Sequence, residues 1–334
     1  MSELLLSTLV ATLTAPAAGT GEFSATSIPQ FPSHRVAIDE ARKVCLLIAA
    51  AEDRSETPPL DIRMDVLEVR YSQACVIRTG SGIQVARQLT IVRCLTLDAN
   101  LVHVFLNICE FVLGKLGATP SVAEVSSQFQ QLSQLFRALA LPATRSIQGV
   151  WGELLLIAVS SGSETLAKAW HQDPLERYDF AAGSDRIEVK TCAAPERSHH
   201  FSLEQLEAPL GSTLCIASIQ VDKSGGGSSV SDLLQEVRTV VSSESYSHIY
   251  RTVVLTLGKS FSDSASVSFD RERAVASLRY YRPEDIPRIS RPLPAGVSSV
   301  RFVSDLSTVR WISQEELQAQ PLFSALYLPA SSRA

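Results

Sequence analysis

The order of hydrophobic and polar positions divides the chain into a strand-rich first part and a second part that mixes helices and strands. Apolar and polar positions alternate along much of residues 36–106, above all in 60–71, 81–92 and 101–106. Alternation with a period of two is typical of half-buried strands, so we predict an antiparallel sheet there. Residues 1–34 hold one short apolar helix and many Ala, Gly, Ser, Thr and Pro residues, which predict an irregular arm.

Apolar residues at helical spacing follow this strand-rich region. Residues 105–116 predict one helix, and residues 121–141 predict a second with Ser121 as its N-cap. Pro142 ends the second helix, because proline lacks an amide hydrogen and its ring clashes with the preceding turn. We therefore place a domain boundary in residues 141–145.

The second half of the chain begins with a long apolar helix and continues with strands. The helix is predicted over 147–170, with a break at Gly162, and the glycine-rich residues 225–229 predict a flexible loop. Three strands and a further amphipathic helix are predicted at 176–182, 185–193, 214–221 and 230–241. The fold class is thus α/β of the α+β kind: an arm (1–34), a β-rich domain with trailing helices (35–143) and a mixed-sheet domain with a C-terminal extension (144–334).

Composition supports a folded, intracellular protein. The chain has 334 residues, 45% of them hydrophobic and 19% charged, which is enough apolar material for two domains. Its net charge of −5 argues against a histone-like coating protein but not against a local nucleic-acid surface. No basic residue precedes Arg35, and no apolar run approaches a membrane span of roughly 20 residues. The six cysteines form no C-x-x-C pair, so we expect buried thiols, a cytoplasmic location and no membrane contact.

Three acids and a lysine are the candidate catalytic and metal-binding residues. Glu153 lies on the long apolar helix, Asp179 on the first strand after it, and Glu188 and Lys190 on the next strand. A hairpin at residues 182–184 brings Asp179 close to Glu188, and the period of two places Glu188 and Lys190 on one face. Carboxylates are hard oxygen ligands for Mg²⁺, and an ammonium stabilises charge on a phosphate. Asp185 is a rival to Asp179, but aspartate beside a turn is usually structural.

This pattern resembles the PD-(D/E)XK superfamily of restriction-endonuclease-like nucleases, and within it an uncharacterised bacterial family found in defence loci. The resemblance is carried by residues 149–156, Tyr178-Asp-Phe, Ile187-Glu-Val-Lys-Thr and residues 200–206. It implies a restriction-endonuclease-like mixed sheet flanked by helices, in which Asp179 and Glu188 bind Mg²⁺ or Mn²⁺. It also implies that Lys190 is the catalytic lysine and Glu153 the helical acid. Tyr178 stands where many members have proline.

Further candidate substrate contacts lie outside these motifs. His200 and Gln205 follow the Glu-x-Lys strand; either contacts substrate, or they are an ordinary loop histidine and a helix-start glutamine. Neighbouring His199 is better explained as an exposed loop residue. Residues 251–310 hold ten basic and six acidic residues, an excess of four. In that segment Tyr280 and Tyr281 lie among arginines that either follow a nucleic-acid backbone or form a solvated surface, namely Arg271, Arg273, Arg279 and Arg282.

The sequence therefore predicts a magnesium-dependent DNA endonuclease that acts in bacterial restriction or phage defence. The resemblance implies DNA as a partner, an ATPase or another defence subunit as a second, and leaves a homodimer open. The alternative is a non-catalytic DNA-binding or scaffold subunit that keeps the nuclease fold. The complete set of Asp179, Glu188 and Lys190 favours the enzyme, because a site without catalytic work is free to lose these residues.

Overall fold

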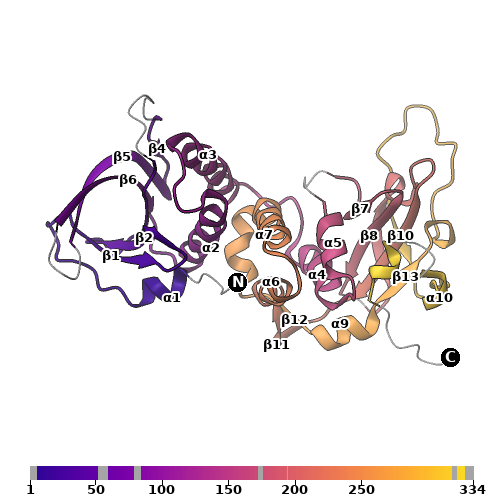
Figure 1. Cartoon of the computed structure of the whole chain (residues 1–334). Coiled ribbons are helices and arrows are strands. Elements are labelled where there is room, and N and C mark those ends of the chain that lie inside the picture. The colour runs from indigo at the N-terminus through magenta and orange to yellow at the C-terminus, as the bar shows by residue number, and fades with distance from the viewer. Residues whose placement is uncertain are drawn as a thin grey trace. The chain divides into compact units, whose positions relative to one another are not determined.

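The computed structural model of the chain describes residues 6–51, 59–78, 84–171, 176–193, 195–317 and 322–327. The chain forms two compact units, Met1–Ala138 and Leu139–Ala334, each of which has its own core (Figure 1). The division falls just before residues 141–145, where the sequence analysis placed a boundary.

The first unit is built on a six-stranded antiparallel sheet in the order β1-β2-β3-β6-β5-β4. Its strands are β1 (Phe23–Ile28), β2 (Phe31–Asp39), β3 (Val44–Ile48), β4 (Ile62–Arg63), β5 (Leu67–Arg78) and β6 (Gln84–Cys94). The predicted irregular arm is wrong for its second half, since β1 and the start of β2 lie within it. As an edge strand β1 is only half buried, so small and polar residues serve there and leave no clear apolar alternation.

Helices α1 (Leu6–Ala11), α2 (Ala99–Leu116) and α3 (Val122–Ala138) complete this unit. Residues 101–106, predicted as a strand, belong to α2, because the Asp98 side chain caps the helix by accepting a hydrogen bond from Leu101 N at 3.0 Å. Ser121 caps α3 as predicted, accepting from Glu124 N. Among the described residues α2 alone is long and apolar enough to cross a membrane, but eight of its residues, from Val104 to Leu113, are buried within the unit.

The second unit contains a four-stranded mixed sheet in the order β13-β10-β8-β7. Strands β8 (Asp185–Cys192) and β10 (Thr213–Gln220) run parallel, while β7 (Phe180–Ala182) and β13 (Arg279–Tyr281) are antiparallel to their neighbours. Two small ladders pair β9 (Ser198–Ser202) with β14 (Arg301–Asp305) and β11 (Lys223–Ser229) with β12 (Ser268–Phe269). This is the α+β, restriction-endonuclease-like architecture predicted for this part of the chain.

The glycine-rich segment predicted as a flexible loop is strand β11. A Cβ atom on Gly227 would lie 2.1 Å from the carbonyl oxygen of Phe269 in the paired strand β12. Glycine is therefore needed there for the close approach of two backbones rather than for flexibility.

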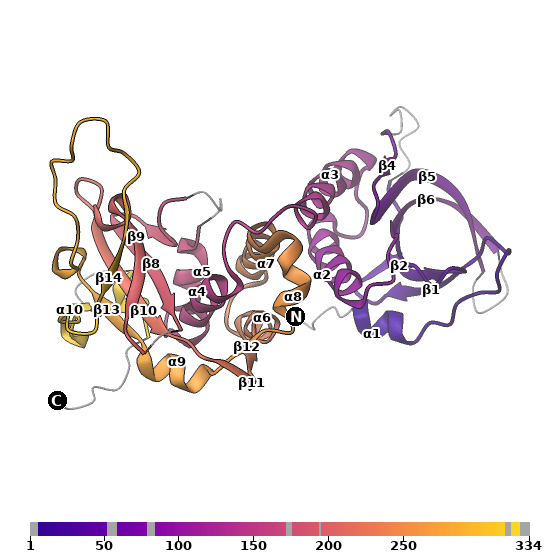
Figure 2. The same cartoon turned by 180° about the vertical axis from the view of Figure 1, so that it is seen from behind.

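The helices described in this unit are α4 (Ile147–Val159), α5 (Ser163–Ala169), α6 (Val230–Val240), α7 (Ser243–Leu257), α8 (Phe261–Ser264), α9 (Arg271–Ser277) and α10 (Gln314–Leu317). Helices α4 and α5 lie on one face of the mixed sheet, and the β9–β14 ladder lies on its other side (Figures 1 and 2). The predicted break at Gly162 separates α4 from α5. Trp151 and Trp170 are buried as expected for core residues, and so are Tyr280 and Tyr281, which excludes these tyrosines as base-stacking platforms in this structure.

Helix α4 lies directly against β8, and Gly152 makes that approach possible. A Cβ atom at this position would meet Thr191 Cγ2 at 2.3 Å. Gln148, one turn earlier, donates to Thr191 Oγ1 at 3.1 Å. The next residue after Gly152 is Glu153, so the helix–sheet distance set here also sets the position of that acid.

We expect Gly152→Ala to lower the free energy of unfolding of the second unit by roughly 1–3 kcal/mol, because the methyl group overpacks the α4–β8 contact. Gly225→Ala is the matched control; its Cβ meets open space, so a change within about 0.5 kcal/mol is expected. Urea unfolding followed by tryptophan fluorescence measures both, since all three tryptophans, Trp151, Trp170 and Trp311, lie in this unit. Equal stabilities of the two variants would contradict the close approach.

Candidate active site

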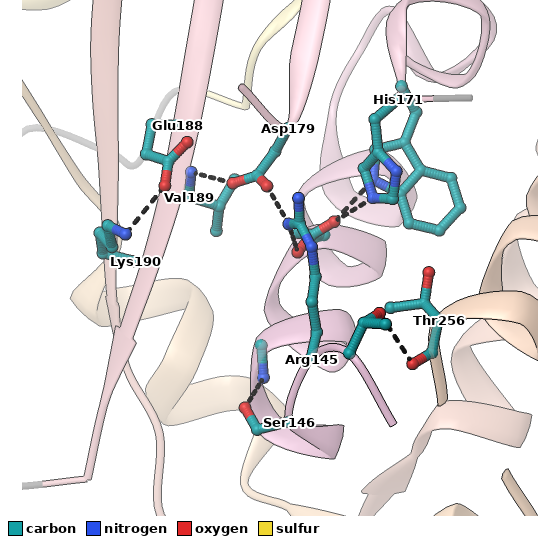
Figure 3. A network of polar contacts seen from close by, with 12 residues as sticks. Arg145, Ser146, His171, Asp179, Glu188, Val189, Lys190 and Thr256 are labelled. Carbon is teal, nitrogen blue, oxygen red and sulfur yellow. Dashed lines mark hydrogen bonds and ion pairs between the residues drawn. The ribbon is translucent and has the colours of Figure 1, made fainter. Parts of the chain in front are cut away.

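Asp179 lies at the point where β7 and β8 separate. The antiparallel register pairs Phe180 with Ile187, so one step further along the ladder Asp179 stands opposite Glu188. Instead of a backbone carbonyl, the Asp179 carboxylate accepts the hydrogen bond of Val189 N, at 2.7 Å from Oδ2 (Figure 3). The carboxylate thus ends the ladder and opens a gap between the strands, and Asp179 is almost fully buried in it.

Glu188 and Lys190 project from β8 on the face away from α4. Lys190 Nζ lies 2.8 Å from Glu188 Oε1 (Figure 3). Gln205, on the 3₁₀ turn η1 (Leu203–Leu206), joins them: its Nε2 donates to Glu188 Oε1 and its Oε1 accepts from Lys190 Nζ at 3.1 Å. The same Gln205 closes a capping box with Ser202, as expected of a helix-start glutamine, and its contact with substrate stays a prediction.

Glu153 reaches the site from α4 and is saturated with donors. Its Oε2 accepts from Trp170 Nε1 at 2.7 Å and lies 3.1 Å from His171 Nε2, while its Oε1 accepts from Arg145 Nη1 at 2.7 Å. The side chain is 2% exposed. A buried carboxylate needs such donors, because an unpaired charge in an apolar interior is very costly.

Arg145 is the part of the site that sequence reasoning missed. Its Nη1 hydrogen-bonds both Glu153 and Asp179, so one guanidinium bridges the helical acid and the strand acid (Figure 3). Thr144 N and Oγ1 both bond Thr256 O, and Ser146 caps α4, so the backbone on either side of Arg145 is fixed. The only signal in the sequence was a lone arginine directly before the cap of an apolar helix.

The three acids carry more negative charge than their two cationic partners cancel. Glu153, Asp179 and Glu188 face Arg145 and Lys190, a sum of −3 + 2 = −1 without His171. Burial and the charge of Asp179 raise the pKa of Glu188 to about 8, although Lys190 opposes the shift. Burial and the charge of Glu153 raise the pKa of Asp179 as well. Burial also acts on Glu153, but donors from His171 and Arg145 hold its pKa below the ordinary value.

These observations fit a divalent cation beside Asp179 and Glu188. Glu188 Oε2 is buried without a hydrogen-bond partner among the described residues, so it is an open acceptor. In that same part of the chain no group of three or more His, Cys, Asp and Glu residues is arranged to hold a metal. Mg²⁺ does not need three protein ligands, because it keeps several water ligands and uses only one or two carboxylates. The residues present therefore suit Mg²⁺ or Mn²⁺ better than a metal that needs a complete protein cage.

The other predicted substrate contacts lie away from Glu153, Asp179, Glu188 and Lys190. His200 is exposed on β9. His199 was predicted to be exposed, which is wrong: it is buried, with Nε2 2.7 Å from Ser218 Oγ, because alternation along β9 turns it into the core. Burial, helped by the charge of Lys190, lowers the pKa of His199 to about 3. Asp185 is structural, since its carboxylate accepts from Leu322 N at 3.0 Å.

The arginines of the 251–310 segment already have partners within the protein. Arg271 pairs with Glu236 at 2.6 Å, Arg273 with Asp222 at 2.7 Å and Arg282 with Glu316 at 2.9 Å. The fourth, Arg279, lies over the Trp311 ring. Their contact with nucleic acid stays a prediction, and each ion pair would have to be exchanged for a phosphate.

Comparison with known proteins gives one family. A family described as "Putative PD-(D/E)XK family member" (DUF4420) matches residues 11–307. The match covers most of both units and includes the four motif residues, Glu153, Asp179, Glu188 and Lys190. No curated protein and no solved structure matches the chain.

The raised pKa of Glu188 predicts how stability depends on pH. A carboxyl whose pKa is higher in the folded state stabilises the protein below its ordinary pKa, and this contribution is lost as pH rises toward about 8. In a chelating buffer the free energy of unfolding should therefore fall between about pH 5 and 8, and less so for Glu188→Gln. Urea unfolding across this range measures the effect, and parallel profiles for both proteins would contradict it.

Proposed function

The chain belongs to this PD-(D/E)XK family, and on that premise we propose that its second unit is a metal-dependent endonuclease that hydrolyses phosphodiester bonds in DNA. The observation that carries the proposal is the convergence of Asp179, Glu188 and Lys190 at the point where β7 and β8 separate. When Mg²⁺ or Mn²⁺ binds beside the two carboxylates, it supplies charge neutralisation for a phosphate and activation of water.

The residues around the carboxylates have distinct tasks in this proposal. Lys190 is held by Glu188, by Gln205 and by the Phe201 ring, whose centroid lies 5.3 Å from Nζ. A fixed ammonium stabilises charge that develops on phosphate oxygens without having to reorganise during the reaction. Gln205 keeps Lys190 and Glu188 at this distance and is a positioning residue.

A group of arginines beside the site supports a polyanionic substrate. Arg177, Arg288 and Arg291 meet around Glu207 and are called the arginine cluster here. Arg177 donates to Glu207 O at 2.8 Å and Arg288 donates to Leu206 O at 3.0 Å, so these two guanidinium groups bond to neutral carbonyl oxygens. Arg291, in contrast, pairs with the Glu207 carboxylate at 2.9 Å.

The arginine cluster is joined directly to the candidate active site. Arg177 is two residues before Asp179, and Glu207 is two residues after Gln205. Tyr178 links the two segments by donating from its hydroxyl to Glu207 O at 2.6 Å. All three arginines are exposed, so a nucleic-acid backbone that reaches Lys190 from this side finds positive charge there.

The resemblance to proteins of defence loci supports a role in restriction or phage defence. It also supports an ATPase or another subunit of such a system as a partner of this chain. We propose that the first unit, with its six-stranded sheet, recognises that subunit or the DNA.

Purified protein should cleave DNA with Mg²⁺ or Mn²⁺ and stop when EDTA is added. Lys190→Ala should lower the cleavage rate by roughly two orders of magnitude or more, the usual loss when one transition-state donor is removed. Lys223→Ala, an exposed lysine on β11, is the control and should leave the rate unchanged. Normal cleavage by Lys190→Ala would refute its catalytic role. Inactivity with all partner subunits present, despite DNA binding, would favour the scaffold alternative.

The arginine cluster predicts a specific salt dependence of DNA binding. Each phosphate contact contributes about −0.9 to the slope of log affinity against log salt on duplex DNA. Arg177→Ala/Arg288→Ala should therefore flatten the slope by about two units, whereas Arg271→Ala/Arg273→Ala should change it less, because both residues are ion-paired. Binding in EDTA, measured by fluorescence anisotropy from low to moderate salt, gives the slopes. The reverse order would place the DNA along helix α9, which carries Arg271 and Arg273.

A further inference from the structure

Arg145 occupies the space between Glu153 and Asp179, where its guanidinium bonds both acids. Its Nη1 bonds Glu153 and Asp179 together, and its side chain is 21% exposed while the two acids are buried. The charge of Glu188 also acts on the Arg145 guanidinium, which is therefore in contact with two of the carboxylates and within electrostatic range of the third. The position is thus filled by a side chain that belongs to the fold.

The surroundings of Arg145 hold it in place. Thr144 is anchored to Thr256 O on α7 at 2.9 Å, and Ser146 Oγ accepts from Gly149 N at 3.0 Å at the start of α4. Glu153 is anchored in turn by Trp170 and His171. A guanidinium with a fixed backbone and a fixed counter-ion does not behave like a mobile surface arginine.

We propose that Arg145 is a built-in cation of the active site, that Glu153 is its positioning residue and not a metal ligand, and that the site therefore binds a single divalent ion through Asp179 and Glu188. The inference rests on the proposed function. Among the described residues the hydrogen bonds of the Arg145 guanidinium run through Nη1 alone, so its remaining N–H groups are open to a phosphate oxygen. Arginine suits this task because its donors form a rigid fork that matches phosphate geometry.

Glu153 has less capacity left for a metal than Asp179 in this arrangement. The Asp179 carboxylate accepts from Arg145 and from Val189 N, whereas Glu153 has three side-chain partners. Oε1 is taken by Arg145, and Oε2 by Trp170 and His171. Glu188 differs, since its Oε2 is free of partners in the part of the chain that the structure describes. The two glutamates therefore have different tasks although both match acids of the family motif.

The test is the number of Mn²⁺ ions bound by the full chain, counted by isothermal titration calorimetry and by electron paramagnetic resonance without DNA. One ion supports the proposal. Two ions in the wild type would overturn it and leave the metal-dependent nuclease intact. No bound ion, together with no cleavage, would remove the proposed function itself.

Variants separate the two glutamates in the same assay. Asp179→Asn and Glu188→Gln should each weaken Mn²⁺ binding by about tenfold or more, the least expected for a lost ligand. Glu153→Gln should weaken Mn²⁺ binding clearly less than either of these variants, because Glu153 acts on Asp179 only through Arg145. A Glu153→Gln protein that binds Mn²⁺ as poorly as Asp179→Asn would show that Glu153 is a ligand and overturn the proposal.

Substitution of Arg145 tests its charge directly. Arg145→Met leaves Glu153 and Asp179 without their shared cation, so a second Mn²⁺ should bind, whereas Arg145→Lys keeps the charge and should still bind one. Circular dichroism checks that both variants are folded. If Arg145→Met is unfolded without metal, the wild-type count and the Glu153→Gln affinity still decide the question. A folded Arg145→Met protein that binds only one ion would contradict the proposal.

Discussion

The burial of three carboxylates where the middle of helix α4 meets the mixed sheet is the constraint on which the second unit depends. Glu153, Asp179 and Glu188 are each no more than 3% exposed. Carboxylates in such surroundings need donors or cations, because removing them from water costs several kcal/mol per charge even after relaxation. Arg145, Lys190 and the side-chain donors of Trp170, His171 and Gln205 meet that need. The elements that carry these donors must therefore converge on one point.

That convergence explains the packing of α4. The helix is apolar on nearly all sides, with eight consecutive buried residues from Val150 to Ile157. It contacts β8 on one side and α5, α6 and α7 on others. Gly152 removes the side chain that would hold the helix away from Thr191. The acid is thus brought to the sheet by a helix whose other contacts are hydrophobic, and packing rather than the ion pairs positions the charges.

The sequence predicts the part of the site that depends on local geometry. A tight hairpin and a strand period of two suffice to place Asp179 opposite Glu188 and Lys190 beside it. Arg145 and His171 were not predictable, because their contacts depend on how loops before and after the α4–α5 pair return to the sheet. The pairing of Arg271 with Glu236 was equally invisible, since it joins α9 to the end of α6.

The fold shows the same division between local and distant information. The helix start at Ser121 and the break at Gly162 were predicted from a capping residue and a glycine. Strand β1 was missed because an edge strand buries too little to need apolar alternation. Strand β11 was missed because its glycine at position 227 is required by the close approach of the β12 backbone, which lies some forty residues later in the chain. The decisive neighbour of β11 is therefore distant in sequence, whereas β1 pairs with the next strand along the chain.

The charge balance gives a physical reason to regard this site as functional. An ion-pair network in a protein interior contributes little net stability, and hydrophobic residues of similar volume are often as stabilising or more so. Here the network is also incomplete: among the described residues Glu188 keeps an oxygen without a hydrogen-bond partner, and the pKa values of both Glu188 and Asp179 are raised above their ordinary values. A fold selected only for stability has no use for such a group. Perturbed carboxylates beside a fixed ammonium and a fixed guanidinium agree with the catalysis on a phosphodiester proposed above.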